Sequence, residues 1–202
     1  MPSLQSLTFD TSELQLDREE SDRKVWFTKD GDGISLNFFD APPNLPSDVK
    51  SSEQVRDFYL SMLQGTPTKL VEMRITRISG CPAIRLILKS PHKPQKASGM
   101  TYLGSITIPF RDFSYVVKCQ CHERGTTGIR EAILFDLMRS SGVISIDSSG
   151  KITGEWNSDA EAHDADFPQH PLSKLRKLLG QIEATGEIDP ATRSEPTFPL
   201  PS

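Results

Sequence analysis

The chain has 202 residues and a formal net charge of −4 at pH 7, a length that suits one domain with extensions and a sizeable buried core. Because there is no basic excess, nucleic-acid binding lacks its usual electrostatic basis. No apolar run approaches the roughly 18 residues of a membrane span, and residues 1–10 show no secretory pattern. The three cysteines are an odd number, which predicts reduced thiols and a cytoplasmic protein.

The first predicted elements are strands near the start of the chain. Leu14 and Leu16 alternate with polar neighbours and predict an edge strand, whereas the highly charged stretch 17–24 predicts a solvated loop. Two alternating runs, 26–28 and 34–38, flank an Asp-Gly-Asp-Gly turn and predict a β-hairpin. The turn has some likeness to a calcium loop, but the downstream ligands and the bidentate glutamate are absent, so a simple turn explains it better.

A helix is predicted over residues 51–64, after the proline-containing loop 41–48. Ser51 and Gln54 have capping-box spacing at its start, and Gly65 ends it. Five apolar residues recur at helical spacing and form one apolar face; they are Val55, Phe58, Tyr59, Met62 and Leu63.

Two further strand pairs follow. The first joins 68–78 to 83–89 through a Ser-Gly-Cys-Pro turn. The basic loop 90–99 then predicts a solvated segment, with contact to an acidic partner as the alternative. The second pair joins 102–110 to 114–122, where strict alternation of apolar and polar residues predicts an antiparallel hairpin with one face on a core.

The cysteines invite a zinc interpretation. Cys119 and Cys121 lie two residues apart in a predicted strand, so both side chains are expected to point into the core. Structural zinc usually uses paired Cys-x₂₋₄-Cys knuckles, and His122 should point away from the two thiols, while Cys81 is distant in sequence. We therefore predict buried, reduced cysteines that behave as small hydrophobes, without metal or nucleophilic activity.

A Gly-Thr-Thr-Gly corner at 125–128 connects the second hairpin to a helix predicted over 128–140. Small residues suit a tight connection. Phosphate binding on free amides is the alternative, but the lysine of a P-loop and the three-glycine dinucleotide pattern are missing. Polar side chains around the corner form a candidate site, although ordinary pairing with one another and with solvent also explains them; they are Glu123, Arg124, Thr126, Thr127, Arg130 and Glu131.

The end of the chain predicts a small hairpin, an acidic linker, a helix and a tail. Residues 143–146 and 152 flank a turn. The linker holds the densest group of possible metal ligands, which a flexible acidic segment also explains; they are Asp159, Glu161, His163, Asp164, Asp166 and His170. Residues 171–184 predict an amphipathic helix with Pro171 in its first turn. We expect it to dock on its own sheet, with a partner's groove as the alternative.

The stretch Arg-Ile-Ser-Gly-Cys-Pro-Ala-Ile-Arg at 77–85 resembles a Gly-x-Pro-Ala turn of Mog1/PsbP-like sequences, where it follows a capped helix and precedes the long central strands. Residues 26–39 are similar to the family's opening hairpin, so the likeness covers 25–140 in element order. The resemblance implies αβα layers with an antiparallel sheet. It also implies a mostly non-catalytic binding or accessory role, as in a partner of a nuclear-transport GTPase and a photosystem II subunit. No partner-binding residue transfers by motif.

We therefore predict an α+β fold in which helices cover an antiparallel β-sheet over residues 1–155. An acidic linker and C-terminal helix follow over 156–185, and a flexible tail over 186–202. The predicted function is a non-catalytic protein-interaction or accessory module with a protein partner and no cofactor, catalytic residue or bound metal. The alternative is an enzyme with a polar site at the Gly-Thr-Thr-Gly corner, acting on a phosphorylated or carboxylated small molecule.

Overall fold

The computed structural model describes residues 1–46, 49–92 and 99–201. Most of the predicted basic loop 90–99 and the end of the loop 41–48 therefore lie outside the described residues. No helix in the described part of the chain is both long and apolar enough to cross a membrane.

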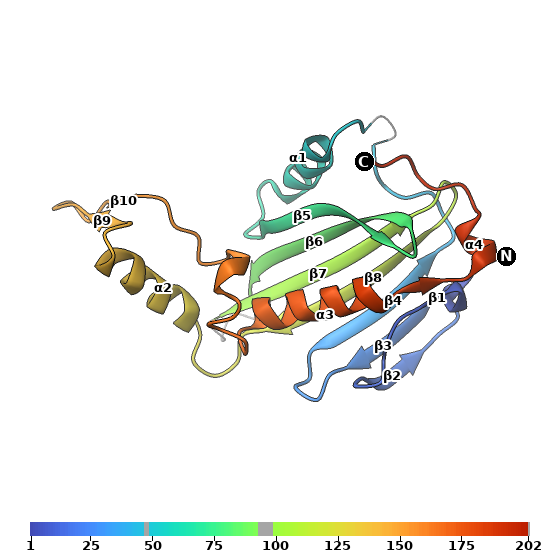
Figure 1. The fold of residues 1–202 in the computed structure, drawn as a ribbon, viewed down its shortest axis with the longest axis horizontal. Helices are drawn as coiled ribbons and strands as arrows, with labels where there is room; N and C mark the ends of the chain where they lie inside the picture. Colours follow the sequence, from blue (N-terminus) through green and yellow to red (C-terminus); the bar gives the residue numbers. More distant parts are fainter. Residues whose placement is uncertain (47–48, 93–98, 202) are drawn as a thin grey trace.

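Seven strands of this part of the chain form one antiparallel sheet. In chain order they are β2 (Gln15–Glu19), β3 (Arg23–Phe27), β4 (Gly33–Phe39), β5 (Lys69–Ile78), β6 (Cys81–Pro91), β7 (Met100–Pro109) and β8 (Ser114–His122). They lie side by side in the order β2-β3-β4-β8-β7-β6-β5 (Figure 1). With helices flanking this sheet, the predicted α+β class is confirmed.

The three predicted hairpins are part of the sheet: β3 pairs with β4, β5 with β6, and β7 with β8. The residues of β8 that were expected to face the core are all buried; they are Tyr115, Val117, Cys119 and Cys121. One interpretation is wrong, because the charged stretch 17–24 is not a loop: β2 and β3 pair across it. All residues of β2 are exposed, and charged side chains on an exposed edge strand also discourage pairing with other chains.

The centre of the sheet is covered by α3 (Pro171–Thr185), which runs across β7 and β8 (Figure 1). Four apolar side chains on one face of this helix are buried; they are Leu172, Leu175, Leu179 and Ile182. The helix approaches β7 closely because that strand carries Gly104, where a Cβ atom would lie 2.8 Å from Leu179 Cδ1. The predicted amphipathic helix thus packs on the sheet of its own chain.

The helix α1 (Ser52–Leu63) begins where predicted. Its cap residue, Ser51, accepts a hydrogen bond of 3.2 Å on Oγ from the Gln54 backbone N–H. The helix packs beside β5, the last strand of the sheet (Figure 1). Val55 is buried, but Met62 is 55% exposed. Only part of the predicted apolar face is therefore buried, because a helix at the edge of a sheet has core beneath only part of its surface.

The helix α2 (Ile129–Ser140) forms, but it does not cover the sheet as predicted. It extends away from the sheet, and β9 (Ser145–Ile146) and β10 (Ile152–Thr153) pair beyond its far end as a small hairpin (Figure 1). Only Arg130 and Leu134 of this helix are buried. The place over β7 and β8, where a helix following β8 could fold back, is occupied by α3.

The stretch 186–202, predicted as a flexible tail, is instead paired and packed over its described residues. The short elements near the two ends of the chain are η1 (Leu4–Ser6), β1 (Leu7–Thr8), β11 (Glu187–Ile188) and α4 (Pro190–Arg193). β1 pairs with β11, and the Phe198 N–H donates to the Pro109 carbonyl at 3.0 Å. Ile188 and Phe198 are buried. The segment therefore buries apolar side chains, which its proline content had not suggested in the sequence.

All three cysteines, Cys81, Cys119 and Cys121, are buried free thiols. Burial raises the pKa of Cys119 to about 12. The thiol form therefore dominates at neutral pH, and the side chain packs as a small hydrophobe.

Candidate functional site

A pocket of about 490 Å³ lies where the Gly-Thr-Thr-Gly corner meets the start of α3. Gly125 and Gly128 have φ angles of 71° and 73°, a region that other residues rarely adopt, so the chain can turn sharply from β8 into α2. Four of the six residues of the predicted polar site line the pocket; they are Glu123, Arg124, Thr126 and Arg130. The other two, Thr127 and Glu131, are not part of its wall.

Glu123 holds the corner against the sheet. Its Oε2 accepts a hydrogen bond of 2.7 Å from the Met100 N–H at the start of β7, and its Oε1 accepts one of 3.0 Å from the Gly128 N–H. The side chain is only 6% exposed. This carboxylate therefore joins the end of β8, the start of β7 and the first residue before α2.

Arg124 reaches the turn between β3 and β4. Its Nη2 donates to the Gly31 carbonyl at 2.9 Å and lies 3.4 Å from Asp32 Oδ1. Burial raises the pKa of Asp32, although the Arg124 charge acts in the opposite direction. Because half of the Arg124 side chain is exposed, its guanidinium is accessible to a solute that enters the pocket.

Arg130, in contrast, is fully buried and donates four hydrogen bonds. It donates to Asp164 Oδ1 and Ser173 Oγ, both at 2.9 Å, and to the carbonyls of Ser158 and Ala160 at 2.7 and 2.9 Å. Arg130 therefore pairs with the linker and with α3, and not with its charged neighbours at the corner.

The predicted acidic linker is held in place by ion pairs, and it contains the short helix η2 (Glu161–His163). Asp164 is shared by Arg130 and Arg176, at 2.9 and 3.1 Å. Asp159 Oδ1 lies 3.0 Å from the Lys89 ammonium. Two carboxylates that were candidates for metal ligation thus have cationic partners, and the description of this segment as flexible is wrong for that reason.

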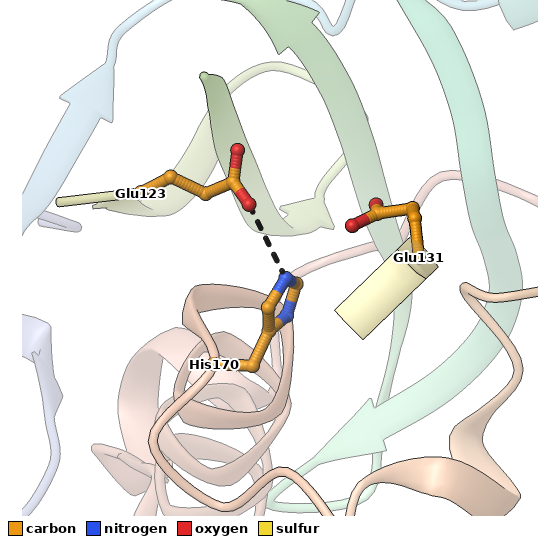
Figure 2. Close-up of side chains that lie close together, drawn as sticks. All are labelled: Glu123, Glu131 and His170. Carbon is orange, nitrogen blue, oxygen red and sulfur yellow. Dashed lines mark ion pairs between the residues drawn. The ribbon is translucent and has the colours of Figure 1, made fainter. Parts of the chain in front are cut away.

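Three side chains from different parts of the chain do form a close cluster at the edge of the pocket (Figure 2). They are Glu123, Glu131 and His170, with one ligand atom of each within 4.8 Å of the others. His170 Nε2 lies 3.7 Å from Glu123 Oε1. Of the metal ligands predicted in the linker, only His170 belongs to this cluster. Sequence reasoning missed the combination, since Glu131 and His170 were assigned to separate sites and meet only because α2 and α3 start side by side.

The protonation of the cluster follows from its hydrogen bonds. His170 is the N-cap residue of α3, and its Nδ1 accepts from the Leu172 N–H at 3.2 Å. Burial, with a contribution from Arg130, lowers the pKa of His170, so the ring is neutral at pH 7 and carries its proton on Nε2. Burial opposes ionisation of Glu131, but the Lys89 ammonium at 2.7 Å outweighs it and lowers the pKa of Glu131.

A second cavity of about 310 Å³ adjoins the pocket. Four residues line both, namely Asp32, Pro168, Gln169 and Lys174. The second cavity adds apolar side chains from the N-terminal segment, β4 and α3; they include Phe9, Leu14, Ile34, Leu178 and Ile182. The two cavities are thus neighbours along α3.

No protein-family model and no curated protein matches the chain. Among solved structures, the fold is similar to the Ran-binding protein Mog1p of Saccharomyces cerevisiae, with 12% identity, a TM-score of 0.43, and coverage of 91% of this chain and 86% of that one.

Two bacterial structures are also similar. One is from Bacteroides thetaiotaomicron, with 8% identity and a TM-score of 0.35, covering 62% of this chain and 41% of that one. The other is PA94 of Pseudomonas aeruginosa, described as a protein of unknown function and putative regulator, with 12% identity and a TM-score of 0.34, covering 63% and 95%.

Proposed function

We propose that this chain is a non-catalytic protein-interaction module that binds its partner through the exposed face of α2. The observation that carries the proposal is an apolar stripe of Ile129, Ile133 and Leu137, which are 45%, 45% and 56% exposed. These residues recur at i, i+4 and i+8 and so lie on one face of the helix. A helix that presents such a row suits an apolar groove on a partner protein.

The surroundings of the stripe support this proposal. Half of the large exposed hydrophobic side chains of the described chain, six of twelve, fall within residues 129–152. The three of these residues that lie outside the stripe are Val143, Ile146 and Ile152. Single exposed hydrophobic residues are ordinary, but a concentration of them marks an interaction surface. Since α2 extends away from the sheet (Figure 1), a partner can reach this surface without displacing any element of the core.

The proposed setting is the cytoplasm. Three buried free thiols suit a reducing compartment, where disulfides are rare.

The stripe is tested by the substitution Ile133→Asp, with Leu60→Asp on α1 as a matched control, because Leu60 is also a helical residue and is 39% exposed. A charge in the middle of an apolar contact should weaken partner recovery at least about tenfold, which corresponds to roughly 1.4 kcal/mol. Affinity capture from the native lysate with quantitative mass spectrometry measures this recovery. Both variants should melt like the original protein, because neither side chain is buried.

A protein that is recovered with the original chain and with Leu60→Asp, but not with Ile133→Asp, would support the stripe as the binding surface. Equal recovery of every protein by the two variants would contradict the proposal. Concentration-dependent size-exclusion chromatography of the same variants identifies the case in which the partner is a second copy.

The pocket supports a second candidate function, the binding or conversion of a small anionic molecule. This candidate is supported by the half-exposed Arg124 side chain, which lines the cavity of about 490 Å³. A guanidinium fits carboxylate and phosphate groups with two parallel hydrogen bonds. This candidate corresponds to the alternative expected at the Gly-Thr-Thr-Gly corner.

A thermal-shift screen with carboxylated and phosphorylated metabolites tests this candidate. A ligand at about 100 times its Kd should stabilise the chain by roughly 2.7 kcal/mol and raise the Tm by several degrees. The shift should vanish in Arg124→Ala and persist in Arg111→Ala, since Arg111 is an exposed arginine in the turn at the opposite end of β8. If no metabolite raises the Tm of Arg111→Ala more than the Tm of Arg124→Ala, this candidate function is wrong.

A further inference from the structure

We infer that Glu123, Glu131 and His170 form a binding site for a divalent first-row transition-metal ion, with Zn²⁺ as the probe. The three side chains project toward one another from the end of β8, the start of α2 and the start of α3 (Figure 2). This site is independent of the apolar stripe on α2, so either inference can fail without the other.

The distances suit a metal after small adjustments. Zinc binds carboxylate oxygen and imidazole nitrogen at about 2.0–2.2 Å, which places two ligand atoms of one tetrahedral site roughly 3.5 Å apart. His170 Nε2 and Glu123 Oε1 are already 3.7 Å apart. All three ligand atoms lie within 4.8 Å of one another, so rotation of the Glu131 side chain is the main adjustment needed.

Unpartnered polar atoms point independently to a ligand in this space. The His170 side chain is 8% exposed, and its Nε2 is buried without a hydrogen-bond partner among the residues that the structure describes. Figure 2 shows this nitrogen directed at Glu123 and toward the Glu131 carboxylate. Glu131 Oε2 is also buried and has no hydrogen-bond partner within residues 1–46, 49–92 and 99–201. Buried polar atoms in folded proteins almost always have a partner, and one metal ion would satisfy both of these atoms.

The charges around the cluster suit a divalent cation. Lys89 contacts Glu131 Oε1 at 2.7 Å and Asp159 Oδ1 at 3.0 Å, so its single positive charge is shared between two carboxylates. The nearby Arg130 is paired with Asp164. Counting Glu123, Glu131 and Asp159 against Lys89 leaves two negative charges. The imidazole favours Zn²⁺ and similar ions over Ca²⁺ and Mg²⁺, which prefer oxygen ligands alone.

Metal binding requires a change of tautomer at His170. In the apo state Nε2 carries the ring proton, because Nδ1 accepts from the Leu172 N–H. To ligate through Nε2, the neutral ring gives up the Nε2 proton to solvent and takes a proton on Nδ1. No net proton is released, and the Leu172 N–H loses its acceptor. The ligated ring then resembles metal-bound histidines that carry the proton on the other nitrogen.

The test is a calorimetric Zn²⁺ titration of the full chain together with Glu131→Gln and a control, His163→Gln. His163 is the imidazole in the linker that lies outside the cluster. The original chain and the control should bind one ion, and Glu131→Gln should bind at least about tenfold more weakly. In ¹⁵N spectra of the histidine rings, the protonated nitrogen of His170 should change from Nε2 to Nδ1 on Zn²⁺ addition.

The variant Glu131→Gln keeps the size of the side chain and an oxygen for Lys89, and circular dichroism establishes whether it is folded. Two results would overturn the site: no saturable Zn²⁺ binding by the original chain, or equal affinity in Glu131→Gln. Zn²⁺ binding that leaves the His170 ring spectrum unchanged would place the ion on adventitious surface ligands and would overturn it as well.

Discussion

Deletion of residues 168–202 is expected to abolish cooperative folding. The deletion removes α3, whose four buried apolar side chains cover β7 and β8; they are Leu172, Leu175, Leu179 and Ile182. Full burial of each side chain contributes roughly 1.5–3 kcal/mol, and the sum is of the same order as the net stability of a whole domain, about 5–15 kcal/mol. The truncated chain should lose its sigmoidal thermal transition in circular dichroism and bind an apolar dye at room temperature.

Single substitutions on the same helix test whether the packing of its side chains, and not only the loss of a chain segment, accounts for the effect of the deletion. Leu175→Ala removes a fully buried side chain beside Gly104 and should lower the free energy of unfolding by about 2–5 kcal/mol. Lys177→Ala, two positions further along, changes an exposed residue of the same helix and should leave the free energy of unfolding nearly unchanged. If the truncated chain melts like the full chain, α3 is dispensable for the sheet, and its apolar face serves a partner instead.

The substitution Asp164→Asn is expected to destabilise the fold strongly through buried charge. Asp164 is the carboxylate between Arg130 and Arg176, whose side chains are 0% and 7% exposed. Breaking a buried ion pair by neutralising one partner typically costs about 3–5 kcal/mol, because the remaining charge stays buried without compensation. Here one neutralisation affects two guanidinium groups, of which Arg176 keeps an ion pair with Glu72 at 3.1 Å. Urea unfolding of the variant should show a midpoint shifted to lower denaturant with an unchanged slope.

Asp112→Asn is a matched control for this experiment. Asp112 pairs with Arg111 at 2.9 Å, the same distance as between Arg130 and Asp164, but both side chains are about two-thirds exposed. Exposed pairs contribute little to stability because water and salt screen them, so the control should unfold like the original chain. Equal midpoints for the two variants would mean that the Arg130–Asp164–Arg176 network does not hold the linker.

The sequence by itself determined the elements with strong local signals. Alternation in 114–122 placed Tyr115 and Val117 in the core, and the structure buries both, because side chains of a strand point to opposite faces at every step. The cap spacing of Ser51 and Gln54 located the start of α1, since the hydrogen bond involved is local. The antiparallel class followed from short turns between long alternating runs.

Only the tertiary structure decided which apolar surface is covered and by what. An amphipathic pattern shows that a helix has an apolar face, but it does not identify the surface opposite that face. Both α2 and α3 carry apolar residues at helical spacing, yet α3 packs on β7 and β8, whereas α2 extends away from the sheet with an exposed stripe (Figure 1). The tail was misinterpreted for a related reason, because burial of Ile188 and Phe198 comes from β1 and the β7–β8 turn, which are far away in sequence.

The candidate site was likewise determined partly by the sequence and partly by the tertiary structure. The sequence placed Glu123, Arg130 and Glu131 at one polar corner, because a few consecutive residues at a strand-to-helix turn must stay close together. It could not determine that Arg130 pairs with the linker or that His170 faces Glu123 and Glu131. Those contacts exist because α3 returns over the sheet and begins beside α2. Electrostatic pairing depends on distances of a few ångströms, and between segments this far apart in sequence only the packed fold defines such distances.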